Sequence, residues 1–249
     1  MARHRAPRLY LDGRLGSGRA VELSAGQAHY LRAVMRLDRS AAVAGFNAVD
    51  GEWLCRIAEA GKSRVRLTVE GQLRLPAPEP DLWLLFAPIK RARLDWLVEK
   101  ATELGVSTLI PVWTSRTQPD RINLERLRMH AVEAAEQSER LSVPELRPPE
   151  ALDSLLAAWP PERPLIVCDE SGAGAPIGAA VQGFAVAPVA FLVGPEGGFD
   201  QTELDALKKL SFVTRIGLGP RVLRAETAAV AALAVFQAIA GDWRRTCTR

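Results

Sequence analysis

The chain is poor in cysteine and histidine, the side chains that build disulfides and most transition-metal sites. Its 249 residues include three of each, which are Cys55, Cys168, Cys247, His4, His29 and His130. Few, odd-numbered and widely spaced cysteines argue against a disulfide framework or a cysteine-based metal site and favour the reducing cytosol. The histidines lack metal-ligand spacing, so we expect no metal site.

Long apolar runs are also missing. None is long enough to cross a membrane, and the basic start Met1–Arg5 lacks the apolar segment of a secretory signal. We therefore expect neither a membrane span nor secretion. The composition, 48% apolar and 24% charged, is that of an ordinary globular protein, and the length allows one large domain or two smaller ones.

The charge is unevenly distributed along the chain. Residues 1–75 hold 13 Lys and Arg against 7 Asp and Glu, a net of +6, whereas the rest hold 19 against 22, a net of −3. A basic excess of this kind indicates that residues 1–75 bind a polyanion. From charge alone, a solvated basic surface is an equally good interpretation.

The first 75 residues have frequent glycines between short alternating runs, which is typical of a small β-barrel. Apolar residues at helical spacing predict one short helix within Ser24–Leu37. The proline-rich segment Leu75–Pro80 predicts a stiff linker, and we place a domain boundary there.

After the linker, strands alternate with helices. Strands are expected at 81–87, 107–113, 165–168, 189–193 and 212–216, and helices at 91–104, 123–140, 200–210 and 225–240. This alternation predicts an α/β fold with a mainly parallel sheet covered on both faces. Asp200 and Glu203 form a helix-capping pattern, and the last helix is apolar all round, so we expect it to be buried.

Two glycine-containing loops follow predicted strands near the end of the chain, Gly194–Phe199 and Gly217–Arg224. Ligands of open α/β sheets bind beyond the carboxyl ends of strands, so these loops could form a crevice for a nucleotide-like cofactor. Neither loop is a Walker loop or a Rossmann fingerprint. A tight strand-to-helix turn also needs glycine, and this alternative stays open for the first loop.

The second loop carries Arg221 and Arg224 just before a helix whose first turn holds Glu226. Arginines at the positive end of a helix dipole are unfavourable without an anion nearby. We therefore expect an anionic ligand, or negative charge that develops during a reaction. On the helix predicted at 123–140, Glu133, Gln137 and Arg140 share one face, which is either functional or simply solvated.

Several sequence motifs occur together in a fixed order, and together they resemble those of a known family. Similarity is carried by Leu192–Phe199, Leu218–Ala228, Glu99–Val106, Glu136–Arg140 with Val143-Pro144, and His29–Leu37. Over nearly its whole length the chain resembles the bacterial RsmE family of 16S ribosomal RNA (uracil-N3)-methyltransferases, of the SPOUT class.

The resemblance implies a PUA-like RNA-binding β-barrel at 1–75 and a SPOUT methyltransferase domain with a trefoil knot at 76–249. It also implies S-adenosylmethionine as cofactor, 16S ribosomal RNA of the small subunit as partner, and a cytoplasmic homodimer whose interface includes the last helix.

Carried over by position, the resemblance and the chemistry of uracil suggest roles for individual residues. Candidate catalytic residues are Arg221 and Arg224, for charge on the uracil oxygens, and Glu226 and Glu196, as a proton acceptor or as structural partners of an arginine. Candidate cofactor-binding residues are Val193, Gly194, Pro195, Glu196, Gly197, Gly198, Ile216, Leu218, Gly219 and Leu223. Candidate RNA-binding residues are Arg3, Arg5, Arg8, His29, Arg32, Arg36, Gln137 and Arg140.

The chain departs from the family pattern at Tyr30, where a second histidine is common, and at Asp38–Ala42, which lacks a basic-x-Gly-Asp turn. Two other functions remain open. One is a SPOUT methyltransferase acting on transfer RNA or on a ribose 2′-hydroxyl. The other is a non-catalytic RNA-binding assembly factor, against which the intact glycines argue.

Overall fold

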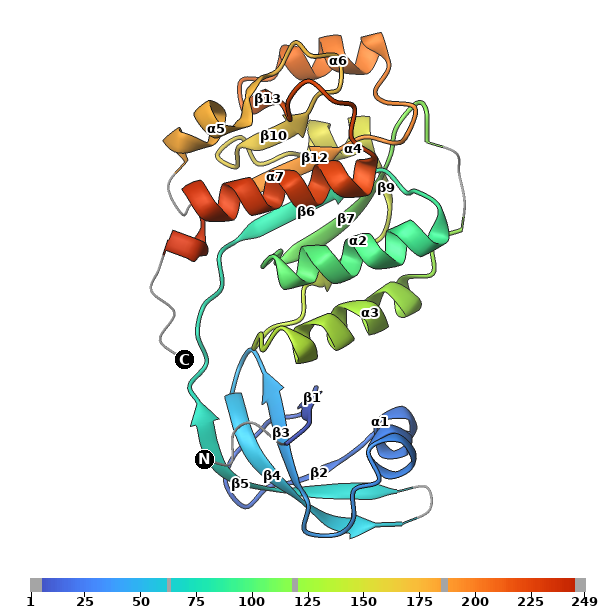
Figure 1. Ribbon diagram of the computed structural model, residues 1–249, viewed down its shortest axis with the longest axis vertical. Helices are drawn as coiled ribbons and strands as arrows, with labels where there is room; N and C mark the ends of the chain where they lie inside the picture. Colours follow the sequence, from blue (N-terminus) through green and yellow to red (C-terminus); the bar gives the residue numbers. More distant parts are fainter. Residues whose placement is uncertain (1–5, 62–63, 118–120, 185–187, 245–249) are drawn as a thin grey trace. The chain divides into compact units, whose positions relative to one another are not determined.

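The computed structural model describes residues 6–61, 64–117, 121–184 and 188–244, which fold into two compact units (Figure 1). The first unit combines the chain up to Pro78 with the later segment Ala135–Val143. The second unit combines Glu79–Ala134 with the chain from Pro144 onward. The return of a later segment to the first unit was not foreseen from the sequence.

A five-stranded sheet forms the first unit. Its strands are β1 (Arg8–Tyr10), β2 (Ala20–Glu22), β3 (Ala42–Asn47), β4 (Gly51–Ala60) and β5 (Val65–Arg74), in the order β1-β3-β4-β5-β2. The β1–β3 pair is parallel and the others are antiparallel. The predicted helix is α1 (Ala25–His29), which continues as a π-helical turn, η1 (Tyr30–Val34). The helix starts at a capping box formed by Ser24 and Gln27, and Leu31 is buried in the apolar core of the unit.

Arg8 fixes the segment Ala135–Val143 to the rest of the first unit. Its Nη1 donates to the carbonyls of Ala135 (2.9 Å) and Glu136 (2.8 Å), and its Nη2 donates to that of Arg140 (2.7 Å). Its Nε pairs with Glu52 at 2.6 Å. Burial raises the pKa of Glu52, but hydrogen bonds from Arg8 and Arg74 outweigh this, and the pKa lies below its ordinary value.

The second unit is built on a parallel sheet. Its strands are β6 (Leu82–Phe86), β7 (Thr108–Trp113), β8 (Glu145–Leu146), β9 (Glu150–Ala151), β10 (Leu165–Cys168), β11 (Ala175–Pro176), β12 (Val189–Val193) and β13 (Val213–Gly217). Their order is β11-β13-β10-β12-β6-β7-β8, and β9 also pairs with β7. Every pair is parallel, so the predicted mainly parallel sheet is confirmed.

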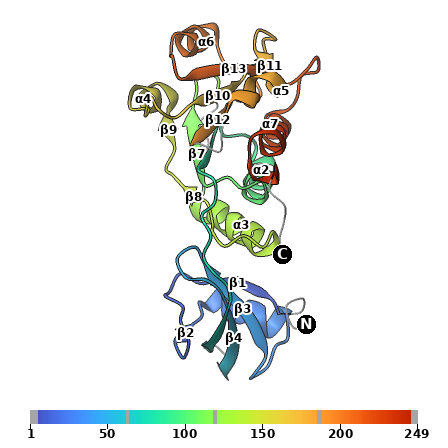
Figure 2. The ribbon, with the colours of Figure 1, turned by 90° about the vertical axis from the view of Figure 1, so that its left-hand side faces the viewer.

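Helices cover both faces of this sheet (Figure 2). On one face, α4 (Leu152–Ala157) and α6 (Gln201–Lys208) pack in one apolar cluster with Leu85 and Leu192. On the other, α7 (Ala225–Ile239) packs on β10, β12 and α2 (Arg91–Glu103). The other helical elements are α3 (Leu124–Gln137), α5 (Ile177–Ala180), and two 3-10 turns, η2 (Val181–Gly183) and η3 (Asp242–Arg244). The capping box of Asp200 and Glu203 at the start of α6 is confirmed.

The helix at the end of the second unit is longer and more apolar than we expected from the sequence. Ala225–Arg244 forms a 20-residue stretch with a hydropathy of 1.2, which by length and composition alone would suffice to cross a membrane. The expectation that no run reaches this length is therefore wrong. Burial of Ala229, Leu233 and Phe236 inside the unit accounts for the apolar composition, because core helices of globular proteins share it.

Candidate functional site

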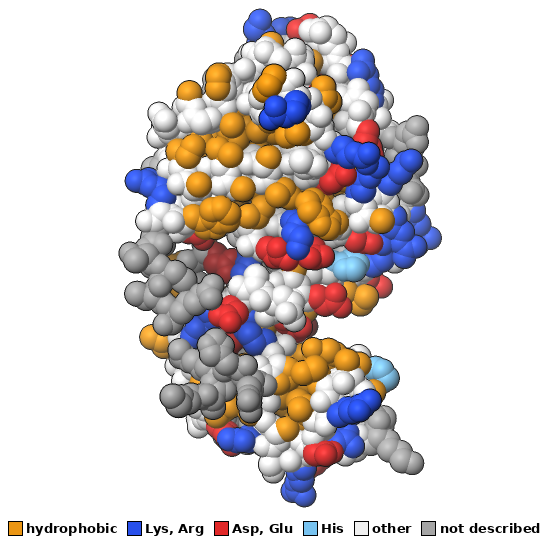
Figure 3. Space-filling model, viewed as in Figure 1, with side chains coloured by type: hydrophobic (Ala, Val, Ile, Leu, Met, Phe, Trp, Pro, Cys, Tyr) orange, Lys and Arg blue, Asp and Glu red, His pale blue; other side chains and the backbone are white. Residues whose placement is uncertain are grey.

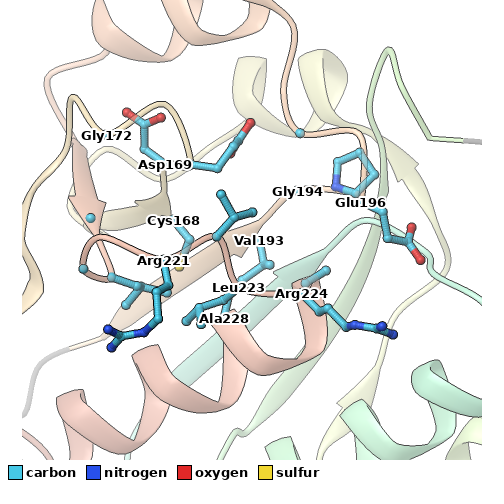
Figure 4. Close-up of a pocket in the computed structure, with 18 of the residues that line it drawn as sticks. Cys168, Asp169, Gly172, Val193, Gly194, Glu196, Arg221, Leu223, Arg224 and Ala228 are labelled. Carbon is cyan, nitrogen blue, oxygen red and sulfur yellow. The ribbon is translucent and has the colours of Figure 1, made fainter.

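A cavity of about 390 Å³ opens where β10, β12 and β13 end (Figure 4). These strands are neighbours in a parallel sheet, so their carboxyl ends meet at one edge, where α/β folds bind ligands. Three loops and the start of α7 form its walls. The lining residues include Cys168, Asp169, Glu170 and Gly172 from the end of β10 onward, Val193–Glu196 and Gly198 from the end of β12, and Gly217–Ala225 from the end of β13.

The loop after β12 depends on its glycines for shape. Gly198 has a φ of +67°, and a Cβ there would lie 2.0 Å from Glu170 Oε1. That same oxygen accepts a hydrogen bond from Phe199 N at 2.9 Å. A Cβ at Gly194 would lie 3.0 Å from the ring of Phe199. Packing within the unit therefore favours glycine at both positions, whether or not a ligand also approaches them.

The loop after β13 brings both candidate arginines to the cavity wall. Arg224 is the residue that precedes α7, and its side chain forms no hydrogen bond to the helix start. Arg221 and Arg224 are both exposed, and neither makes an ion pair among the described residues. Figure 4 shows them reaching out on different sides of the cavity, with Glu196 on the side of Arg224. Together with the positive end of α7 they give this side of the cavity a positive potential.

Arg93 of α2 lies between the two candidate acids. Its Nη1 is 3.6 Å from Glu196 Oε1, and its Nε is 3.5 Å from Glu226 Oε1. Glu226 is buried, does not line the cavity, and its Oε2 has no hydrogen-bond partner among the described residues. Glu196 lines the cavity and is partly exposed. The sequence analysis did not single out Arg93, because only the tertiary fold brings α2 to these loops.

The loop after β10 was missed as part of the site. Asp169 is buried and accepts hydrogen bonds from Arg215 Nε at 2.8 Å and from Ser171 N at 2.9 Å. Burial raises the pKa of Asp169, but the hydrogen bonds from Ser171 and Arg215 lower it by more than burial raises it. The pKa of Asp169 therefore lies below its ordinary value. The signal was present, because Asp169 directly follows a strand predicted at 165–168, and strand ends hold the ligands of such sheets.

Most predicted cofactor-binding residues line the cavity. These are Val193, Gly194, Pro195, Glu196, Gly198, Leu218, Gly219 and Leu223. The other two lie beside it. Gly197 presents its carbonyl to Arg116 Nη1 at 2.8 Å, and Ile216 is fully buried in β13.

The predicted RNA-binding residues fall into four groups. His29, Arg32 and Arg36 are exposed on and just after α1 and η1, with Arg32 paired to Asp38 at 2.7 Å. Arg8 uses its donors inside the first unit, as described above. Gln137 is exposed at the end of α3, whereas Arg140 is buried beyond the end of that helix, so it does not share the helix face predicted for it. Arg3 and Arg5 lie outside the described residues.

No group of three or more His, Cys, Asp or Glu side chains that could hold a metal occurs in the part of the chain that the structure describes. Cys168 reaches the cavity wall, but burial raises the pKa of its thiol to about 12, which disfavours the thiolate that metals and electrophiles need.

Comparisons with known proteins agree on one family. A family model for an RNA methyltransferase domain matches residues 77–237. Ribosomal RNA small subunit methyltransferase E of Rickettsia conorii is 33% identical over 228 residues, which cover 91% of this chain and 93% of that protein.

Two solved structures resemble the whole chain. A methyltransferase from Legionella pneumophila in complex with SAM has a TM-score of 0.84 at 30% identity, covering 94% of this chain and 98% of that one. Ribosomal RNA small subunit methyltransferase E from Neisseria gonorrhoeae bound to S-adenosylmethionine has a TM-score of 0.85 at 26% identity, covering 96% and 99%. The chain therefore belongs to the RNA methyltransferase family that includes the ribosomal RNA small subunit methyltransferases E.

Proposed function

We propose that this protein transfers the methyl group of S-adenosylmethionine to N3 of a uridine in 16S ribosomal RNA of the small subunit. The observation that carries the proposal is the glycine-shaped cavity at the ends of β10, β12 and β13, with Arg221 and Arg224 in its wall. Support comes from the relatives, whose names specify ribosomal RNA of the small subunit and whose structures hold the cofactor.

The cavity fits the cofactor in size and chemistry. Its volume of about 390 Å³ lies within the range of roughly 300–1,000 Å³ that is common for small-molecule sites. Val193, Leu223 and Ala228 offer apolar surface, and the loop backbones offer hydrogen-bonding groups for a purine edge. Glu170 offers negative charge for the cationic parts of the molecule. When bound, S-adenosylmethionine supplies a methyl group already activated by its positive sulfur.

The arginines are suited to stabilise the nucleophile. N3 of uracil must lose its proton before its lone pair can attack, and the resulting negative charge spreads over O2 and O4. Arg221 or Arg224 beside these oxygens would stabilise that charge, an effect of about 3 kcal/mol for one well-placed donor. Binding of both molecules in one cavity would also hold the reacting groups in line, which provides much of the acceleration for an activated donor.

Of the two candidate acids, Glu196 is better placed to accept the proton of N3. It lines the cavity and is partly exposed, whereas Glu226 is buried against Arg93 and does not line the cavity. In this proposal Glu226 holds Arg93, and Arg93 in turn positions Glu196.

The first unit is proposed to be a PUA-like domain that binds RNA. His29, Arg32 and Arg36 present polar and positive groups on its surface. Contacts of this kind with phosphates would position the RNA without reading its sequence. The target base would then be unstacked and inserted into the cavity, as enzymes acting on bases do.

A trefoil knot in the second unit, a homodimer and a cytoplasmic location complete the proposal. The order of strands is compatible with a knot, because β13 and β12 lie on either side of the earlier strand β10. Support for the dimer comes from α7, where Val230, Ala231, Ala234 and Val235 are only partly buried in one chain. A second copy could cover them.

Methyl transfer from labelled S-adenosylmethionine to small ribosomal subunits that lack the modification tests the proposal. Nucleoside analysis should detect 3-methyluridine with the unaltered protein and much less with Arg224→Ala. A 2′-O-methylated nucleoside, or labelling of transfer RNA alone, would contradict the proposed substrate. Absence of both transfer and cofactor binding would instead favour a non-catalytic assembly factor.

A further inference from the structure

The loop after β12 has little shape of its own. This segment, Gly194–Phe199, is called the cofactor loop below. Three of its six residues are glycine, and four of the six line the cavity. Glycine allows the backbone more conformations than other residues do, so ordering it costs more entropy. The shape of the cofactor loop at the cavity therefore depends on contacts made from outside the loop.

One such contact comes from Arg116, in the turn that follows β7. Its Nη1 donates a hydrogen bond to the carbonyl of Gly197 at 2.8 Å. A Cβ added at Gly197 would lie 3.6 Å from both Cβ and Cδ of Arg116, so the stem of the arginine runs along the backbone of this glycine. Neither residue lines the cavity. Arg116 therefore contacts the cofactor loop without occupying the space for a ligand.

The turn that carries Arg116 is itself well held. Thr117 N donates to the carbonyl of Thr114 at 3.0 Å, and Thr114 N donates to Thr117 Oγ1 at 3.1 Å. Ser115 N donates to Oε1 of Glu203, in the first turn of α6, at 2.7 Å. These bonds close the turn and join it to the helix that follows the cofactor loop. The guanidinium group of Arg116 thus extends from a fixed piece of backbone.

Arg116 fixes one peptide unit of the loop. The carbonyl of Gly197 and the N–H of Gly198 belong to the same planar trans peptide and point in opposite directions. Gly198 N donates to the carbonyl of Pro195 at 2.9 Å, whereas Arg116 holds the other end of the unit. Hydrogen bonds at both ends set the plane of this peptide. Glu196 and Gly198, which flank Gly197, both line the cavity, so the contact with Arg116 shapes its wall.

We propose that Arg116 is a positioning residue for S-adenosylmethionine, and that its hydrogen bond to Gly197 holds the cofactor loop in the shape that binds this molecule. The identity of the ligand rests on the proposed function, whereas the bond between the two loops belongs to the fold itself. Arg116 acts through the loop and does not touch the ligand.

Contact with a phosphate of the RNA is the competing role for Arg116. The residue is exposed, and α3 is the next helix along the chain. Figure 3 shows Lys and Arg side chains gathered at the edge of the second unit where α2 and α3 begin. The hydrogen bond to Gly197 favours the positioning role, because it commits the guanidinium group to the loop. The test therefore measures affinity for both molecules.

Arg116→Met removes the donor but keeps an apolar stem that can lie along Gly197. Isothermal titration calorimetry should show S-adenosylmethionine bound about 10-fold more weakly, the effect of one hydrogen bond from a charged donor. Affinity for a labelled single-stranded oligoribonucleotide containing uridine, measured by fluorescence anisotropy without the cofactor, should be unchanged at every salt concentration. Lys208→Ala is the matched control, since Lys208 is exposed on α6 and does not line the cavity. It should keep both affinities.

Arg116→Lys is the second variant. It keeps a positively charged donor on a long stem and should bind S-adenosylmethionine more tightly than Arg116→Met does. Equal losses in these two variants would contradict a role for the donor.

The two affinities together keep the outcomes distinct. Unaltered affinity for S-adenosylmethionine in Arg116→Met would overturn the proposal. A loss of RNA affinity with a weaker salt dependence, and no loss of cofactor affinity, would identify a phosphate contact instead. Equal losses of both affinities would make Arg116 a residue that only stabilises the fold, which also overturns the proposal. A failure of the proposed function appears separately, as absence of methyl transfer by the unaltered protein.

Discussion

Replacing Gly198 by alanine should disrupt the cofactor loop through a specific collision. The backbone at Gly198 has a φ of +67°, and the new methyl group would lie 2.0 Å from Glu170 Oε1. Left-handed backbone costs a non-glycine residue about 1–2 kcal/mol. Displacing Glu170 also breaks its 2.9 Å hydrogen bond with Phe199 N, and a bond to a charged group contributes about 1.5–3 kcal/mol.

The two costs together predict a loss of about 3 kcal/mol in the native loop. If the loop must regain its shape to bind S-adenosylmethionine, the affinity should fall by about 100-fold, since 1.4 kcal/mol corresponds to a factor of ten. Isothermal titration calorimetry measures this affinity directly. Gly18→Ala is the control, because Gly18 in the first unit has a φ of +78°, no atom lies within 4 Å of the added Cβ, and Gly18 does not line the cavity. That variant carries the same backbone strain but should keep its full affinity for S-adenosylmethionine.

The role of Glu170 can be tested by a double-mutant cycle. Glu170→Ala should weaken cofactor binding in the unaltered protein, where the hydrogen bond to Phe199 is intact. In the Gly198→Ala background it should have almost no further effect, because that bond is already broken. Wild-type affinity in Gly198→Ala would refute the reasoning. So would an equal effect of Glu170→Ala in both backgrounds, since Glu170 would then not have moved.

Three further predictions concern other parts of the chain. Arg224→Ala should lower kcat by about 10²–10³-fold and leave cofactor affinity nearly unchanged in calorimetry; an equal loss of affinity would make Arg224 a cofactor-binding or folding residue. Glu52→Gln should lower the free energy of unfolding of the first unit by about 3 kcal/mol, because it leaves the partly buried Arg8 without its charge partner. Since the folded pKa of Glu52 lies below its ordinary 4.5, its contribution is complete above that pH and is lost as the pH falls through the folded pKa. Denaturant titrations at several pH values should show a larger loss of stability at low pH in the unaltered protein than in Glu52→Gln, in which carboxylates such as Asp169 still titrate; an equal loss in both would contradict the assignment. In a Cys247→Ser variant the native protein at pH 8 should resist thiol reagents, because burial raises the pKa of Cys168 to about 12; rapid modification that the cofactor prevents would show that thiol to be accessible.

The sheet of the second unit was predictable because each of its central strands has a recognisable local sequence pattern. Apolar runs such as Leu165–Cys168 and Val189–Val193 are followed by glycine or acidic residues and then by helical patterns, and such strands are recognisable without tertiary information. The two-residue strands β8, β9 and β11 were missed. They carry no periodicity and exist only because a neighbouring strand offers hydrogen-bonding groups.

The site was predictable where it follows from strand ends and unpredictable where it depends on distant side chains. The glycine loops and the two arginines follow directly from the sequence. Arg93 does not, since its neighbourhood shows only a basic helix start, and its contacts with Glu196 and Glu226 arise when α2 packs beside α7. Arg8 was predicted to bind RNA, but its side chain donates to backbone carbonyls that lie more than 120 residues away along the chain.

The return of Ala135–Val143 to the first unit has a consequence for the order of events during synthesis. All strands of that unit have been synthesised when Pro78 is added, but the carbonyl groups that accept hydrogen bonds from Arg8 have not. They follow 65 residues later, from position 78 to position 143, which takes about 3–13 s at 5–20 residues per second. During that interval the guanidinium of Arg8 has Glu52 but lacks its three carbonyl acceptors, so the first unit reaches its final stability only when part of the second unit has already been translated.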